Sequence, residues 1–311
     1  MKIIFFGTSN VALPILEALS KKHEIVAVVT SPDAKVGRKQ ELKESPVSVL
    51  ATEMKLKLLK PVKVKGEAGF VEELSALGAD MFVVVSYGKI LPLQVINLPK
   101  YKTVNVHFSP LPKYRGPSPI QAALQNGDEY TGSSVFILDE KVDNGPLLST
   151  EIIKIDSDDN YLTLSQKLAY KAAGSINQVL EDYVTGKTTP LPQDEASATY
   201  TKIISKTDGQ IDWNKSAYEI YNQFRAFFPW PGVWTRWNGK VLKIIDLEPA
   251  LKSQAEPGSA KNCGLVLDGG KIACGQDTFL WLKMVQLEGK KETLIQDFLN
   301  GYSEFVGSEL K

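Results

Sequence analysis

Residues 2–29, KIIFFGTSNVALPILEALSKKHEIVAVV, contain the pattern that decides the fold. An apolar run over residues 2–6 precedes Gly7 and a stretch of apolar residues at helical spacing, and a second β-branched run covers residues 25–29. Strand, helix and strand within about thirty residues are typical of the opening of a parallel α/β sheet. The glycines of a dinucleotide fingerprint are missing after Gly7, which argues against a nicotinamide-dependent oxidoreductase.

Later apolar runs extend this sheet. Residues 81–85 are continuously apolar, which is typical of a strand covered on both faces. The patterns also predict strands over 103–108 and 134–138, and helices over 119–125 and 162–184. The polar residues 31–46, bounded by prolines, predict a mobile surface loop. We therefore expect an N-terminal α/β domain, Rossmann-like with a mostly parallel sheet, over residues 1–186.

The composition changes after residue 186. Prolines and polar residues without apolar periodicity follow, and they predict a linker over 187–207. A helix is expected over 216–227. Short apolar runs separated by Gly and Asn come after it, and they predict a small C-terminal β-barrel of OB-like type over 208–311.

Charge and cysteine content limit the classes of function. The 311-residue chain has 36 Lys and Arg against 36 Asp and Glu, so no global field attracts a polyanion, although a local basic groove remains compatible with this balance. Cys263 and Cys274 are too few for a disulfide framework and indicate a reducing compartment. The apolar start is too short for a signal peptide or a membrane span, so we expect a cytoplasmic protein without a membrane partner.

Residues 104–116, VNVHFSPLPKYRG, contain the candidate chemistry. Side chains alternate along a strand, so Asn105 and His107 share one face near its carboxyl end, where open α/β sheets bind ligands. Two polar side chains on one side of a buried strand need polar partners. The prolines and Gly116 that follow predict a rigid loop at the rim. A core histidine bonded to a backbone carbonyl is the alternative for His107.

An acidic group is expected from the turn over residues 139–146, DEKVDNGP. Either Asp139 or Asp143 can hydrogen-bond its own backbone as a turn residue, and spacing alone does not say which one reaches the histidine. His23, the only other histidine, follows two lysines at the end of the first predicted helix and is expected to be solvated or placed by the helix dipole.

Together these motifs resemble the folate-dependent formyltransferase superfamily. The resemblance rests on Asn-x-His, the Ser-x-Leu-Pro-x-Tyr-Arg-Gly loop and the Val-Asp-x-Gly turn. It implies a catalytic site of Asn105, His107 and Asp143, with 10-formyltetrahydrofolate as co-substrate and no metal. The usual Ser-Leu-Leu-Pro is Ser-Pro-Leu-Pro here, which adds rigidity without touching a catalytic position. The residues that the resemblance implies at the folate are Tyr87, Gly88, Lys89, Ile90, Leu91, Ser109, Leu111, Pro112 and Asp139.

Further motifs are similar to those members of the superfamily that formylate methionyl initiator tRNA for translation initiation. They include Pro119-Ile120-Gln121, Ile211-Asp212-Trp213 and the RAFFPWP stretch over 225–231. This similarity implies initiator methionyl-tRNA and a reduced folate as partners of a monomer, with Arg38, Lys39, Lys43, Arg115 and Lys206 contacting the tRNA. A formyltransferase acting on a nucleotide-linked amino sugar is the alternative, which the neutral charge suits slightly better. A non-catalytic RNA-binding protein is a third.

Overall fold

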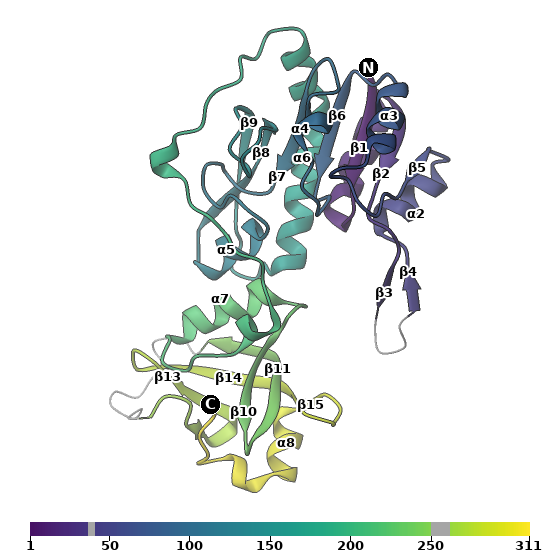
Figure 1. The fold of residues 1–311 in the computed structure, drawn as a ribbon. Helices are drawn as coiled ribbons and strands as arrows, with labels where there is room; N and C mark the ends of the chain where they lie inside the picture. The colour runs from purple at the N-terminus through teal and green to yellow at the C-terminus, as the bar shows by residue number, and fades with distance from the viewer. Residues whose placement is uncertain (37–40, 250–261) are drawn as a thin grey trace. The chain divides into compact units, whose positions relative to one another are not determined.

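The computed structural model describes residues 1–36, 41–249 and 262–311, and the chain forms two compact units (Figure 1). The first unit comprises residues 1–119, 130–154 and 163–201. The second comprises residues 120–129, 155–162 and 202–311.

The first unit is built on a seven-stranded sheet with the strand order β5-β2-β1-β6-β7-β8-β9. Neighbouring strands from β5 to β7 pair in parallel, whereas β8 and β9 are antiparallel. The predicted Rossmann-like, mostly parallel sheet is therefore confirmed. The strands are β1 (Lys2–Gly7), β2 (Glu24–Val29), β5 (Leu58–Leu59), β6 (Met81–Val85), β7 (Thr103–His107), β8 (Tyr130–Ile137) and β9 (Leu147–Lys154).

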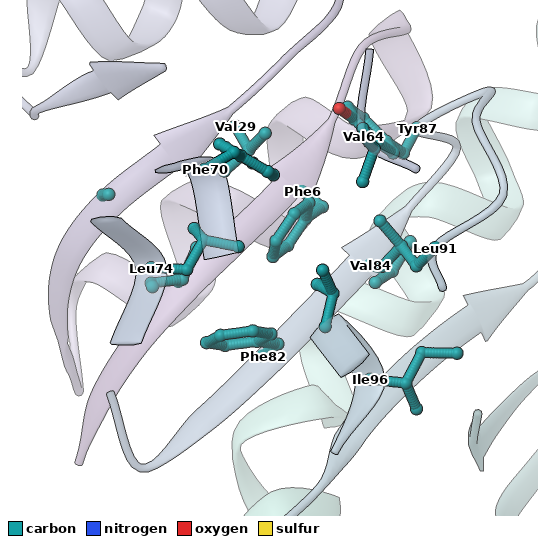
Figure 2. Close-up of a cluster of buried hydrophobic side chains, with 13 residues drawn as sticks. Phe6, Val29, Val64, Phe70, Leu74, Phe82, Val84, Tyr87, Leu91 and Ile96 are labelled. Carbon is teal, nitrogen blue, oxygen red and sulfur yellow. The ribbon is translucent and has the colours of Figure 1, made fainter. Parts of the chain in front are cut away.

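One face of this sheet carries an apolar core (Figure 2). Phe6 of β1 and Phe82 of β6 lie 5.4 Å apart between ring centroids, and helix α3 (Ala68–Ala76) packs Phe70 and Leu74 against them. Phe5 and Val83 on the opposite face are buried as well, and burial on both faces accounts for the continuous apolar runs in the sequence. The other helices of the first unit are α1 (Leu13–Ser20), α2 (Pro46–Glu53), α4 (Leu93–Ile96) and most of α6 (Tyr161–Val184), whereas α5 (Pro119–Gln125) belongs almost entirely to the second unit.

The polar segment 31–46 differs from the predicted loop. It contains a short antiparallel pair of strands, β3 (Ala34–Val36) and β4 (Glu41–Lys43), in which Val36 lies opposite Glu41. The two strands, of three residues each, are held by main-chain pairing. Strand prediction depends on apolar periodicity, which this polar segment lacks, so the sequence does not reveal them.

The second unit contains a six-stranded antiparallel sheet with the order β10-β11-β14-β13-β12, and β15 pairs with β14. The expected C-terminal β-domain is confirmed in this form. Helix α7 (Ala217–Phe227) begins at a capping box, in which Ser216 and Glu219 bond each other's main-chain N–H groups. No helix in the described ranges is long and apolar enough to cross a membrane. The remaining elements are β10 (Val233–Trp237), β11 (Lys240–Pro249), β12 (Val266–Leu267), β13 (Lys271–Cys274), β14 (Thr278–Leu287), β15 (Thr293–Leu294) and α8 (Ile295–Gly301).

Candidate active site

Asn105 and His107 project from β7, which is paired on both sides. Asn105 lies beside Val84 of β6 and opposite Phe136 of β8, so main-chain pairing fixes its position. His107 is 6% exposed and Asn105 is half-buried. The two side chains therefore share one face near the carboxyl end of the strand, as the alternation along the sequence predicts.

His107 has an acceptor on each side of its ring. Its Nε2 lies 2.9 Å from the carbonyl oxygen of Tyr114, and its Nδ1 lies 3.5 Å from Oδ2 of Asp143. A carbonyl oxygen can only accept, so Nε2 carries a proton. A neutral ring would then direct the lone pair of Nδ1 at a carboxylate, whereas a doubly protonated ring satisfies both partners. Both ring nitrogens of His107 thus face an oxygen acceptor.

The two aspartates of the turn between β8 and β9 have different surroundings. Oδ1 of Asp139 accepts from the main-chain N–H of Lys141 at 2.9 Å, so Asp139 is the turn residue. Asp143 faces His107 instead, and its Oδ2 also accepts from the main-chain N–H of Gly116 at 2.7 Å. The geometry thus distinguishes two residues that spacing could not.

The side-chain amide of Asn105 is not paired with any protein group in the described residues. It is half-buried in a sheet where polar groups are normally hydrogen-bonded. A partly exposed amide of this kind can donate an N–H group to a substrate oxygen on which negative charge develops. Asn105 is therefore the group of this site that is available to a substrate.

The loop after β7 is held from β8. The hydroxyl of Ser134 donates to the carbonyl oxygen of Ser109 at 2.8 Å and accepts from the N–H of Leu111 at 3.1 Å. The side chains of Ser109 and Leu111 are buried, whereas Pro112 is half-buried. Of the three folate-contacting residues expected in this loop, Pro112 is the one whose side chain is partly exposed.

The segment that follows β6, residues 87–91, has both buried and exposed residues. Tyr87 packs edge-on against Phe6 at 5.5 Å, and burial raises the pKa of its hydroxyl to about 12. Lys89 donates from Nζ to the carbonyl oxygens of Pro61 and Val62. Gly88 and the side chain of Ile90, which is 84% exposed, face solvent. Parallel β6 and β7 end at the same edge of the sheet, so this segment and the loop after β7 border the same region.

The residues expected to contact tRNA are dispersed. Arg38 and Lys39 lie outside the described residues, whereas Lys43 and Lys206 are exposed and belong to different units. Arg115 is only 1% exposed, and its guanidinium group donates to side chains of its own unit. Its charge is therefore compensated within the protein.

Three groups at His107 and Asp143 have no signal in the residue pattern. The carbonyl of Tyr114 and the N–H of Gly116 are main-chain groups, which residue type does not reveal. Gln193, whose Nε2 donates to the carbonyl oxygen of Asp143 at 2.9 Å, lies in the segment that its composition predicts to be a linker. His23 also differs from expectation, because its ring is half-buried and this burial lowers its pKa.

Asn105 and His107 on β7 supply an amide and an imidazole, and Asp143 supplies a carboxylate from the turn between β8 and β9, a set of groups that acyl transfer can use. The chain belongs to the formyl transferase family. The family described as "Formyl transferase" matches residues 1–180, and "Formyl transferase, C-terminal domain" matches residues 203–303.

Relatives with substantial identity cover almost the whole chain. A protein of Caldicellulosiruptor saccharolyticus is 40% identical over 97% of this chain and 97% of its own length. One of Staphylococcus epidermidis is 36% identical over 99% of both chains, and both relatives are named methionyl-tRNA formyltransferase.

Two solved structures share the fold at lower identity. An N-formyltransferase from Helicobacter canadensis, in complex with folinic acid and dTDP-3-aminofucose, aligns with a TM-score of 0.68 and 21% identity over 91% of this chain and 98% of that one. HypX from Aquifex aeolicus in complex with tetrahydrofolic acid aligns with a TM-score of 0.61 and 16% identity over 98% of this chain and 48% of that one.

Proposed function

We propose that this protein transfers the formyl group of 10-formyltetrahydrofolate to the α-amino group of methionyl initiator tRNA, for translation initiation. The observation that carries the proposal is the 40% identity, over 97% of both chains, to a relative named methionyl-tRNA formyltransferase. The arrangement of Asn105, His107 and Asp143 supplies the groups that the reaction needs.

The reaction is an acyl transfer. The amine nitrogen bonds to the formyl carbon, and the bond from that carbon to N10 of the folate breaks. The amine loses a proton and N10 gains one. Negative charge develops on the formyl oxygen, and the free amide of Asn105 donates an N–H group to it. One such donor contributes roughly a hundred- to a thousandfold in rate.

His107 and Asp143 handle charge and protons. The ring of His107 adds positive charge beside the developing oxyanion when it carries both protons, and Asp143 holds the ring from its Nδ1 side at 3.5 Å. The carboxylate of Asp143 accepts the proton that the amine loses, directly or through water. An α-amino group has a pKa of about 8, so an appreciable fraction is neutral near pH 7 and modest assistance suffices.

The folate is proposed to lie along the carboxyl edge shared by β6 and β7. Gly88 and Ile90 are the groups of the first segment that face solvent, and the main chain of residues 109–112 borders the same edge. Lys43 and Lys206 are exposed cations for tRNA phosphates, with Arg38 and Lys39 as further candidates. The buried, compensated Arg115 is left out of this surface.

The test is an assay of the purified full chain with 10-formyltetrahydrofolate and two acceptors, methionyl initiator tRNA and a nucleotide-linked amino sugar. We expect formyl-methionyl-tRNA as the product and no turnover of the sugar. His107→Ala serves as the control and should bind the tRNA while transferring no formyl group. Turnover of the amino sugar alone would contradict the proposal, and so would full activity of His107→Ala.

A further inference from the structure

Two residues in unusual backbone conformations hold His107. Tyr114, whose carbonyl accepts from Nε2, has φ 60°, and Asp143, which faces Nδ1, has φ 51°. Residues other than glycine rarely adopt this left-handed backbone region, and such conformations persist only where the surroundings determine them. Something must therefore hold both residues in place.

One side chain reaches both segments. The Nε2 of Gln193 donates to the carbonyl oxygens of Asp143 at 2.9 Å and Gly145 at 2.8 Å. Its Oε1 accepts from Arg115, at 3.1 Å from Nε and 2.9 Å from Nη2. Both N–H groups and the oxygen of this amide are thus in use. Because Arg115 follows Tyr114 directly, the amide joins the two segments that contact the two sides of His107.

Arg115 is itself fixed at several points. Its Nη1 and Nη2 donate to the two carboxylate oxygens of Glu195 at 3.1 and 2.9 Å, and Nη1 also donates to the hydroxyl of Tyr200 at 3.1 Å. A fork-to-fork pair of this kind fixes direction as well as distance. The side chain of Arg115 is 1% exposed, whereas that of Glu195 is 61% exposed, so the buried guanidinium group is bonded to a carboxylate that reaches solvent.

The main chain around Gln193, residues 191–201, is called the strap segment here, and it contacts the same two parts of the chain as the Gln193 side chain. Leu191 exchanges two hydrogen bonds with Leu147 at the start of β9, at 2.8 and 2.9 Å. At its other end, Thr199 accepts from the N–H of Arg115 at 2.8 Å and Thr201 donates to its carbonyl at 2.7 Å. The strap segment is thus bonded both to the strand after the Asp143 turn and to the loop after β7.

We propose that Gln193 is a positioning residue, which acts with Arg115 to hold Asp143 and Tyr114 against the two sides of the His107 ring. This inference rests on the proposed formyl transfer for its effect on rate. Removing the amide loosens the main chain of the Asp143 turn, so that of these contacts only the N–H of Gly116 still holds the carboxylate opposite Nδ1. A displacement of about 1 Å at such a group can cost on the order of a hundredfold in rate.

The test compares Gln193→Leu, which keeps the bulk and removes the hydrogen bonds, with Gln178→Leu. Within the described part of the chain, the side chain of the exposed Gln178 bonds Asp182 of the same helix, α6, and it makes the matched control. The steady-state kcat for transfer to methionyl-tRNA should fall about 30-fold in Gln193→Leu, with both KM values within about twofold, because the groups that bind substrate are untouched. Gln178→Leu should match the wild type.

A double-mutant cycle separates positioning from general damage. In an Asp143→Asn background, Gln193→Leu should slow transfer by less than about threefold, because its effect acts through Asp143. The same loss in both backgrounds would overturn the proposal.

Hydrogen exchange provides a readout that needs no activity. Exchange of the amides over 139–146 should rise about tenfold or more in Gln193→Leu and stay unchanged in Gln178→Leu. Unchanged protection in Gln193→Leu would overturn the proposal whether or not the wild type is active. An inactive wild type would instead refute the proposed function.

Discussion

Two neighbouring strands present very different side chains on the same face of the sheet. On β6, Phe82 and Val84 belong to the apolar core (Figure 2), whereas on β7 Asn105 and His107 form the candidate site. Val84 and Asn105 are direct partners in the parallel ladder. The face of the sheet therefore changes from apolar core to candidate site between Val84 and Asn105, which are neighbours on two paired parallel strands.

The first row, Phe82 and Val84 on β6, is the apolar or core row, and the second row is Asn105 and His107 on β7. The two rows differ in the contacts that hold their side chains in place. Burial of Phe82 and Val84 is non-directional, so any close-packed apolar environment satisfies them. His107 instead depends on directed contacts with Tyr114 and Asp143, which arrive from two separate loops. Substitutions in the first row should therefore cost stability, and substitutions in the second should cost rate.

Phe82→Ala should produce the largest effect. Phe82 is 1% exposed and contacts Phe6, so truncation leaves a cavity in the core and should lower the free energy of unfolding by about 3–5 kcal/mol. Urea unfolding at 25 °C measures the change. Tyr170→Ala, an exposed aromatic of α6, is the control and should change it by no more than about 0.5 kcal/mol. A loss below about 1 kcal/mol in Phe82→Ala would mean that this row is not the core.

Asn105→Ala should produce the opposite pattern. Loss of the proposed donor to the formyl oxygen should lower kcat by roughly 100- to 1,000-fold, equivalent to about 2.7–4 kcal/mol in the transition state. The stability should change by less than about 1 kcal/mol, because the amide has no protein partner to lose within the described chain.

Steady-state formylation assays and urea unfolding on the same preparation separate the two quantities. Asn300→Ala, on the exposed surface of α8, is the matched control. Equal losses of rate and stability in Asn105→Ala would show that Asn105 belongs to the core row.

The same contrast explains how much the sequence reveals. The apolar runs over 2–6, 25–29 and 81–85 correspond to β1, β2 and β6 because burial on both faces is written locally in residue type. Alternation along a strand also sufficed to place Asn105 and His107 on one face. What a strand imposes on its own residues could be predicted.

Contacts between distant loops could not be predicted in this way. Asp139 and Asp143 lie in one turn, and only the path of the chain decides which of them faces His107. Gln193 contacts Asp143 from 50 residues away, in a segment whose prolines and polar residues suggest a linker. The burial of Tyr87 in the core could not be predicted either, because the family resemblance implies only that the residue lies at the folate, which stays a prediction.

Tyr87→Phe removes a hydroxyl from the apolar core and should have the smallest effect. The hydroxyl of Tyr87 is buried and has no hydrogen-bond partner among the described residues. Removing an unpaired buried hydroxyl leaves the ring packing against Phe6 intact, so the free energy of unfolding should rise by up to about 1 kcal/mol at pH 8. Tyr170→Phe, at an exposed ring, should be neutral.

The pH dependence of the same variant sharpens this test. Burial raises the pKa of Tyr87 to about 12 in the folded chain, against an ordinary value of about 10. Between these values the unfolded chain releases the proton while the folded chain keeps it, so stability falls as pH rises from 10 towards 12. The wild type should therefore lose up to about 1.4 kcal/mol per pH unit more than Tyr87→Phe over this window. Urea unfolding at pH 8, 10 and 11 measures the free energy of unfolding of both proteins. If the two values changed in parallel with pH, the hydroxyl of Tyr87 would be in contact with water and would not belong to the apolar core.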